Sequence, residues 1–288
     1  MSNKEIDDLS GTETTGHEWD GIKELNTPLP RWWLWTFYGC IVFALGYVIA
    51  YPAIPLISSA TPGLLGYSSR ATLDAYLDAA KAAQGGLVQQ VADTPVAEIA
   101  SNPDLARFAA AGGRSLFKVY CVQCHGTGAT GGPGYPNLND DDWIWGGTID
   151  QIYTTLTHGV RWEADTDTRF NIMPNFGADG LLEPAQITTA ARYVASLSGL
   201  EGGENTPEGQ QLFAENCAAC HGDAGQGLPD MGGPSLVDAI WLYDGSLAGI
   251  ETQLQKPRHG VMPAWGARLG DTAVKQLAVY VHSLGGGK

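Results

Sequence analysis

Two five-residue motifs of the form C-x-x-C-H constrain this chain more than any other feature. The first runs from Cys121 to His125 and the second from Cys217 to His221, with an offset of 96 residues in a chain of 288. Each follows a similar segment, Gly113-Arg-Ser-Leu-Phe117 before the first and Gly209-Gln-Gln-Leu-Phe213 before the second. The C-terminal portion therefore contains two copies of one unit.

Further landmarks recur in the same order in both copies. They are Pro136-Asn-Leu138 and Pro234-Ser-Leu236, His158-Gly-Val160 and His259-Gly-Val261, and Met173-Pro174 and Met262-Pro263. The histidine-to-methionine spacing is 15 residues in the first copy and three in the second, so the first carries an insertion of 12. Apolar residues with a helical period close each copy, at Ile187, Ala190, Ala191, Val194 and Leu197 and at Val274, Leu277, Val281 and Leu284. No sustained alternation predicts a sheet, so we expect an all-α fold.

The C-x-x-C-H spacing is the attachment signature of a c-type haem. Two thiols on one helical turn can add to the two vinyl groups of a haem, and the next residue places an imidazole beneath the iron. A zinc site would need a second ligand pair at suitable spacing, and the two pairs here are 96 residues apart. The sequence therefore predicts two covalently attached haems c, held by Cys121 and Cys124 with His125, and by Cys217 and Cys220 with His221.

Two methionines are the predicted sixth ligands of the iron atoms. Met173 and Met262 each precede a proline and stand before a closing helix, an arrangement that resembles class I cytochromes c. In those cytochromes a downstream proline carbonyl holds the proximal histidine, which points to Pro136 and Pro234. Histidine–methionine ligation saturates the iron and raises its potential. His158 and His259 are alternative sixth ligands, and would make a haem bis-histidine.

The methionines can be paired with the haems in two ways. The simple pairing puts Met173 with the haem on His125, and Met262 with the haem on His221. If the two copies pack face to face, the sequence also allows an exchange of methionines between them. A different match, the G-x-G-x-x-G pattern from Gly126 to Gly131, lacks a preceding strand and is interpreted as a coincidence.

A single apolar segment predicts a membrane anchor. No charged residue occurs between Arg31 and Arg70, and Trp32–Tyr51 is almost wholly apolar. About 20 helical residues span a hydrocarbon core about 30 Å thick. Tryptophans at one end and tyrosines at the other match the two membrane interfaces. Cys40 lies within this segment and is assigned no function.

The net charge of −15 excludes a basic nucleic-acid-binding face. It fits a protein partner that carries a basic docking patch. Because haem thioethers are formed outside the bacterial cytoplasm, the residues after the anchor are expected in the periplasm, and Lys23 and Arg31 before it agree with this orientation. The predicted organisation is a cytoplasmic tail (1–31), an anchor (32–55), a helical periplasmic connector (56–107) and two cytochrome c domains (108–200 and 205–288).

The entry into the anchor carries a family resemblance. Residues Asp20 to Tyr38 (DGIKELNTPLPRWWLWTFY), followed by one span and Tyr51-Pro-Ala-Ile-Pro55, resemble the dihaem subunit III of cbb3-type cytochrome c oxidases. The resemblance covers essentially the whole chain. It implies an inner-membrane subunit of a proton-pumping terminal oxidase, with haem positions at the four motif cysteines, the two motif histidines, Met173 and Met262.

The resemblance also implies partners and a role. Electrons would come from a donor cytochrome c and pass to a monohaem subunit, and from there to the haem–copper subunit that reduces oxygen. The chain itself would have no catalytic site. Two alternatives remain open from the sequence, a dihaem peroxidase or dehydrogenase with one open iron position, and a free membrane-tethered carrier.

Overall fold

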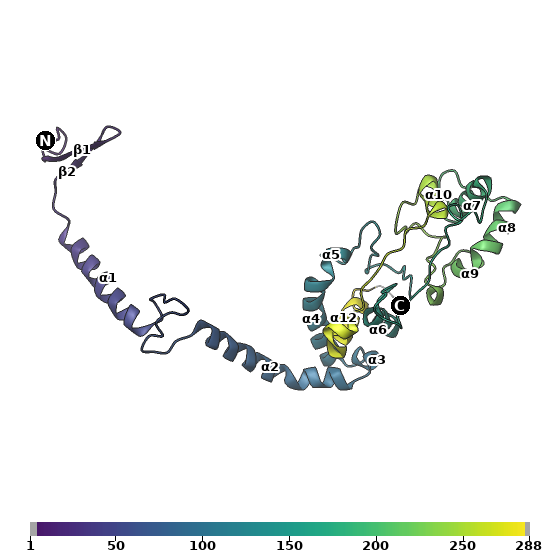
Figure 1. The fold of residues 1–288 in the computed structure, drawn as a ribbon, viewed down its shortest axis with the longest axis horizontal. Coiled ribbons are helices and arrows are strands. Elements are labelled where there is room, and N and C mark those ends of the chain that lie inside the picture. The colour runs from purple at the N-terminus through teal and green to yellow at the C-terminus, as the bar shows by residue number, and fades with distance from the viewer. Residues whose placement is uncertain (1–4, 286–288) are drawn as a thin grey trace. The chain divides into compact units, whose positions relative to one another are not determined.

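The computed structural model describes residues 5–285, which divide into two units that meet within one helix, at residues 82 and 83. Helices are the predominant regular secondary structure in both units (Figure 1). The predicted predominance of α-helix is therefore confirmed. The sequence did not predict the small two-stranded sheet near the N-terminus.

That sheet is a hairpin formed by β1 (Thr14–Trp19) and β2 (Ile22–Leu25), which pair antiparallel. Asp20 and Gly21 form the two-residue turn, and both have positive φ, at 49° and 83°. Asp-Gly is a favoured sequence for such a turn because its twist matches that of the strands. The strands are short and mostly exposed, so the sequence has no clear alternation that would reveal them.

The predicted anchor is one continuous helix, α1 (Arg31–Ala50), and no residue in it is buried by protein. It is the one helix in the described part of the chain that is long and apolar enough to cross a membrane. The following loop folds back onto its end. Leu64 and Leu65 donate backbone hydrogen bonds to the carbonyls of Ile49 and Ala50, at 2.9 and 3.0 Å. These bonds satisfy carbonyl groups that a helix end otherwise leaves free.

The segment predicted as the connector, residues 56–107, begins with a loop and then becomes helical. It contains α2 (Ser69–Asp93) and the short α3 (Val96–Ile99). Leu73, Tyr76 and Leu77 on α2 are exposed, whereas Val91 near its end is fully buried. The end of α2 and α3 thus join the first of two hydrophobic cores.

The first core is formed mainly by α4 (Pro103–Tyr120), α6 (Ile149–His158) and α12 (Asp271–His282). Gly113 allows α4 and α12 to approach closely, since a Cβ atom there would lie 2.1 Å from the backbone oxygen of Gln276. One turn later, Phe117 contacts Tyr280 edge to face, with ring centroids 5.5 Å apart. The glycine and phenylalanine of the repeat therefore form a helix-crossing site.

The second core is formed by α7 (Pro184–Leu197), α8 (Pro207–Asn216) and α10 (Leu247–Gln255). It reproduces the same crossing. A Cβ atom on Gly209 of α8 would lie 2.8 Å from the Cβ of Tyr193 on α7, and the Phe213 and Tyr193 rings lie 5.4 Å apart. The remaining short helices are α5 (Val122–His125), α9 (Ala218–His221), η1 (Pro229–Met231) and α11 (Gly266–Leu269).

The two copies exchange their closing helices. The opening helix α4 of the first copy packs against α12 of the second, and the opening helix α8 of the second packs against α7 of the first. The predicted domain ranges 108–200 and 205–288 follow the sequence repeat, whereas each core draws on both ranges. The 12-residue insertion after His158 gives the first copy the chain length to leave one core and enter the other.

Candidate haem sites

Each C-x-x-C-H motif forms a single helical turn directly after a longer helix. In the first motif, Cys124 and His125 donate backbone hydrogen bonds to the carbonyl of Cys121, at 3.1 and 2.9 Å. Cys220 and His221 make the same two bonds to Cys217, at the same distances. This turn places two thiols and an imidazole side by side, as covalent haem attachment requires.

A backbone carbonyl holds each motif histidine. The Nδ1 of His125 lies 3.1 Å from the oxygen of Pro136, and the Nδ1 of His221 lies 2.9 Å from the oxygen of Pro234. Because a carbonyl only accepts, Nδ1 carries the proton and Nε2 keeps its lone pair. Burial also lowers the pKa of both histidines, which favours the neutral ring. Both rings are therefore prepared to coordinate a metal.

Glycines allow the proline loop to close over each histidine. Gly131 and Gly227 have φ values of +68° and +82°. A Cβ atom on Gly131 would lie 2.4 Å from the oxygen of Tyr135, and one on Gly227 would lie 2.8 Å from the nitrogen of Ser235. Gly131 is the last glycine of the G-x-G-x-x-G match, so that glycine serves loop packing next to the C-x-x-C-H turn.

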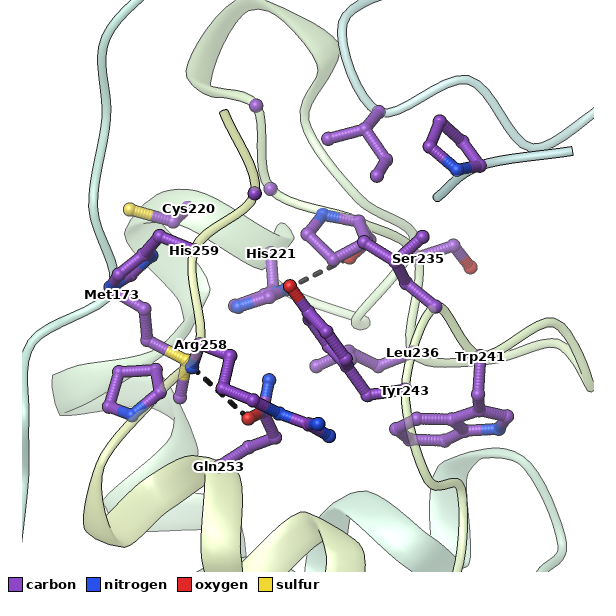
Figure 2. A pocket seen from close by; sticks show the side chains of 18 of the residues that line it. Met173, Cys220, His221, Ser235, Leu236, Trp241, Tyr243, Gln253, Arg258 and His259 are labelled. Atoms are coloured by element: carbon purple, nitrogen blue, oxygen red, sulfur yellow. Dashed lines mark hydrogen bonds between the residues drawn. The ribbon is translucent and has the colours of Figure 1, made fainter. Parts of the chain in front are cut away.

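A cavity adjoins each motif. The larger, about 400 Å³, is lined by Cys217, Cys220, His221 and Met173 (Figure 2). The smaller, about 200 Å³, is lined by Cys121, Cys124, His125 and Met262. All eight predicted haem residues therefore line one of two cavities, and each cavity holds one complete set of two cysteines, one histidine and one methionine.

The methionines are exchanged between the copies. Met173 belongs to the first copy but lines the cavity of the second motif, and Met262 does the reverse. This geometry differs from the simple pairing and matches the exchanged one. Its cause is the crossover of the two chain segments, which carries each methionine into the other core together with its closing helix.

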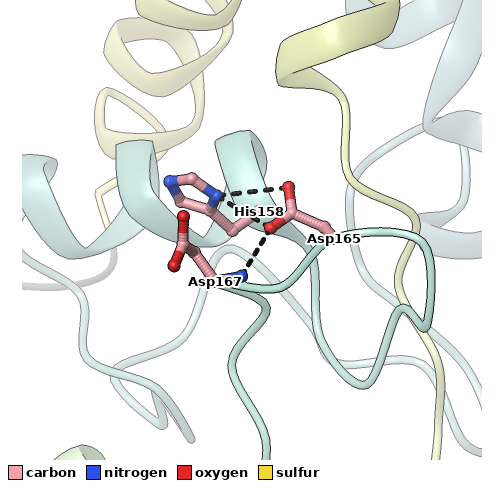
Figure 3. Close-up of side chains that lie close together, drawn as sticks. All are labelled: His158, Asp165 and Asp167. Atoms are coloured by element: carbon pink, nitrogen blue, oxygen red, sulfur yellow. Dashed lines mark hydrogen bonds and ion pairs between the residues drawn. The ribbon is translucent and has the colours of Figure 1, made fainter.

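The two alternative histidine ligands lie in different places. His158 lines neither cavity, and its Nδ1 lies 3.1 Å from a carboxylate oxygen of Asp165, with Asp167 beside it (Figure 3). His259 is exposed and lines the larger cavity, as does Met173 (Figure 2). The Asp165 carboxylate thus engages the His158 ring outside both cavities.

Comparison with known proteins agrees with this arrangement. The family model for "Cytochrome C oxidase, cbb3-type, subunit III" matches residues 108–194 and 204–281, and that for the "N-terminal domain of cytochrome oxidase-cbb3, FixP" matches residues 11–58. Together they cover more than half of the chain. The chain belongs to the cbb3-type cytochrome c oxidase subunit III family.

Curated relatives match over the full length of this subunit III chain. The "Cbb3-type cytochrome c oxidase subunit FixPc" of Rhizobium leguminosarum bv. viciae is 57% identical over 288 residues, covering 100% of both chains. The subunit FixP of Rhizobium meliloti (strain 1021) is 54% identical, covering 99% of this chain and 98% of its own. The subunit CcoP of Cereibacter sphaeroides is 51% identical, covering 96% and 95%. The chain is thus a haem c-binding, membrane-anchored electron-transfer subunit of an oxidoreductase complex.

One buried hydrogen-bond donor without an acceptor indicates whether the larger cavity of this subunit III can hold a haem. The Nε1–H of Trp241 is buried and has no acceptor among residues 5–285, and the Trp241 side chain lines this cavity (Figure 2). A haem carries two carboxylates, either of which would satisfy that donor. The corresponding Trp143 of the first copy donates instead to the oxygen of Asp140 at 3.0 Å. The residues present fit a haem.

The first cysteine of each motif, Cys121 or Cys217, is buried, and this burial raises the pKa of its thiol. Burial raises the pKa of both thiols to about 11. Thiolate is the stronger nucleophile, so these positions keep their thiols protonated and unreactive at neutral pH.

One wall separates the two cavities. Its residues include Asn137, Asp142, Ile144, Arg161, Leu242 and Gly260, each of which lines both. The sequence analysis missed Trp241, Asp142 and Arg161 as site residues. Trp241 could have been found from the repeat, because Trp143 and Trp241 both stand seven residues after the landmark proline of their copy. The shared wall depends on the crossover, so no sequence pattern indicated it.

Proposed function

We propose that this chain carries two covalently attached haems c and relays single electrons within a cbb3-type oxidase. The donor would be a cytochrome c, and the acceptor the monohaem subunit, which passes electrons to the haem–copper subunit where oxygen is reduced. The observation that carries this proposal is the pair of cavities separated by one wall, each lined by both cysteines and the histidine of one motif and by one of the two predicted methionine ligands.

The axial ligands in this proposal follow the crossed geometry. One iron takes His125 and Met262, and the other takes His221 and Met173. Two observations support this assignment: His125 and His221 donate hydrogen bonds to the carbonyls of Pro136 and Pro234, and His158 lines neither cavity. His259 also lines the larger cavity, but its side chain is exposed, which favours Met173 as the ligand there.

The mechanism is electron transfer between haem edges, with no bond made or broken in a substrate. When bound, the haem supplies an iron that takes up and releases one electron. His125 with Met262, and His221 with Met173, would hold the two irons, and the wall shared by the two cavities would keep the two haems apart. His/Met ligation leaves no open position for a substrate, which disfavours the peroxidase or dehydrogenase alternative.

The membrane placement is part of the same proposal. Helix α1 would lie in the bacterial inner membrane, with residues 1–31 in the cytoplasm and the haem-bearing residues in the periplasm. None of its side chains is buried by the rest of the protein, and Leu73, Tyr76 and Leu77 on α2 are exposed. Lipid and the other oxidase subunits are the partners that would cover them.

Purification through an affinity tag on this chain, in mild detergent, tests the proposal. The proposal predicts a chain mass increased by two haems that acid–acetone does not extract, together with b-type haem and copper in the purified complex. A chain without added haem mass would contradict it. Recovery with haem c but without b-type haem and copper would favour a free carrier, and carbon monoxide binding to the reduced isolated chain would favour the enzyme alternative.

A further inference from the structure

Arg161 lies at the crossover of the two copies. It follows Val160 at the start of the insertion, and its side chain makes two hydrogen bonds to backbone. Nε donates to the carbonyl of Gly260 at 2.7 Å, and Nη1 donates to the carbonyl of Asn171 at 3.0 Å. Gly260 precedes Met262 by two residues, and Asn171 precedes Met173 by two. One guanidinium therefore holds the equivalent backbone position before each methionine.

The charge of Arg161 is placed between the two cavities. Its side chain lines both of them and is half-buried. Within residues 5–285, no carboxylate forms an ion pair with it. Guanidinium remains protonated in proteins, so a positive charge stands in the shared wall. A charge in a partly desolvated position acts on neighbouring redox centres more strongly than one in water.

The backbone of Arg161 is held in an unfavourable conformation. Its φ is +51°, in the left-handed region that residues other than glycine seldom adopt. The backbone N–H of Arg161 bonds the carbonyl of Arg169 at 2.8 Å, and Arg169 in turn bonds that of Gly159 at 3.2 Å. These bonds fix the turn and aim the side chain into the wall, because such strain persists only where surrounding contacts determine it.

The second copy has no equivalent residue. There Val261 is followed directly by Met262, because the insertion that begins with Arg161 is absent. Arg258 is the other arginine near the larger cavity, but it is exposed, stacks over Tyr243 at 4.1 Å and does not line the smaller cavity. Arg161, a residue of the first copy, thus lines both cavities and has no counterpart in the second copy.

We propose that Arg161 is a positioning residue shared by the two haem sites, which holds both methionine segments and raises the reduction potential of both haems through its charge. The inference rests on the proposed function. A positive charge near an iron favours the reduced state, which carries one positive charge fewer, so removal of Arg161 should lower both potentials together.

The test is a redox titration of the intact, detergent-solubilised oxidase complex with Arg161→Gln, Arg161→Lys or Arg258→Gln. Arg161→Gln should lower the midpoint potentials of both haems c. Arg161→Lys keeps the charge but replaces the planar guanidinium, whose two nitrogens bond the two carbonyls, with a single nitrogen, so both potentials should fall by less. Arg258→Gln, the matched control, should affect at most the haem on His221.

Mass analysis of the chain distinguishes a failure of the proposed function from a failure of the role proposed for Arg161. A wild-type chain with fewer than two haems would refute the proposed function itself. With two haems present, a fall confined to one haem in either Arg161 variant, or two unchanged potentials, would overturn the role of Arg161. So would an equal fall of both potentials in Arg258→Gln. If Arg161→Gln does not accumulate, Arg161→Lys decides by the same criterion.

Discussion

Val160 and Met262 form an antiparallel bridge between the two copies of the repeat. The N–H of Val160 donates to the carbonyl of Met262 at 2.9 Å, and the N–H of Met262 donates back at 3.0 Å. Gly159 must remain a glycine, because its Cβ would lie 2.3 Å from the Met262 oxygen. The crossover that brings Met262 to the cavity of His125 is therefore held by backbone hydrogen bonds, independently of any iron–sulfur bond.

Because α4 and α12 cross at Gly113, alanine substitution at Gly113 should destabilise the protein much more than alanine substitution at the adjacent Gly112. In Gly113→Ala, the new methyl group would meet the backbone of Gln276, which cannot move aside without shifting a helix. We expect a loss of about 1–3 kcal/mol of stability, the usual cost of overpacking. In Gly112→Ala the methyl group meets only the amide end of the Gln276 side chain, which can rotate away.

Thermal unfolding of the purified holoprotein checks this pair. The midpoint temperature should fall clearly for Gly113→Ala and stay near that of the wild type for Gly112→Ala. Equal midpoints for the two variants would show that α4 does not cross a closing helix at Gly113.

The orphaned donor of Trp241 predicts a selective change in potential. Trp241→Phe keeps the aromatic ring and removes only the N–H. If that N–H bonds a haem carboxylate, its loss leaves more negative charge near the iron and lowers the potential of the haem on His221, with haem content unchanged. Trp143→Phe removes a donor already bonded to Asp140 and should mainly reduce stability. Redox titration with an unchanged potential in Trp241→Phe would count against this contact.

Asp142 in the shared wall predicts a pH dependence of stability. Burial, with the nearby charges of Asp238 and Asp140, raises the pKa of this carboxyl from 3.8 to about 6. Because the folded pKa is raised, the folded state binds the proton more tightly than the unfolded chain does. The resulting stabilisation is present below about pH 4 and is lost as the pH rises through about 6.

Asp142→Asn removes that titration. Its thermal midpoint should exceed that of the wild type at pH 7, and the two should converge below about pH 4. The control is Asp141→Asn, which alters an exposed neighbour and should leave the pH profile as it is in the wild type. A constant difference between Asp142→Asn and the wild type at all pH values would contradict the shifted pKa.

The sequence predicted the elements of this fold well, because each has a local signal. The apolar run of α1, the helical periods of α7 and α12 and the two C-x-x-C-H turns all depend on residues close together in the chain. The contacts of Pro136 and Pro234 with the motif histidines were also predicted, because each proline lies in the same copy as its histidine and each copy resembles a class I cytochrome c. The hairpin of β1 and β2 escaped because its strands are too short for alternation to stand out.

The crossover could not be predicted from the repeat. Gly113 and Phe117 need a closing helix with a tyrosine at one position, and both Tyr193 and Tyr280 meet that need. The two pairings therefore bury equivalent contacts, and only the three-dimensional path of the insertion distinguishes them. Arg161 and Asp142 gain their positions in the wall from that path, so no local pattern identified them.

The crossed ligation can be tested most directly in chains that carry one haem. Cys217→Ala/Cys220→Ala leaves a single attachment site, at Cys121 and Cys124. In that background we predict that Met262→Ala lowers the potential of the remaining haem and abolishes the red charge-transfer absorption of iron(III)–thioether ligation, while Met173→Ala leaves both unchanged. The opposite outcome, with Met173→Ala effective and Met262→Ala silent, would contradict the exchange of methionines between the two copies.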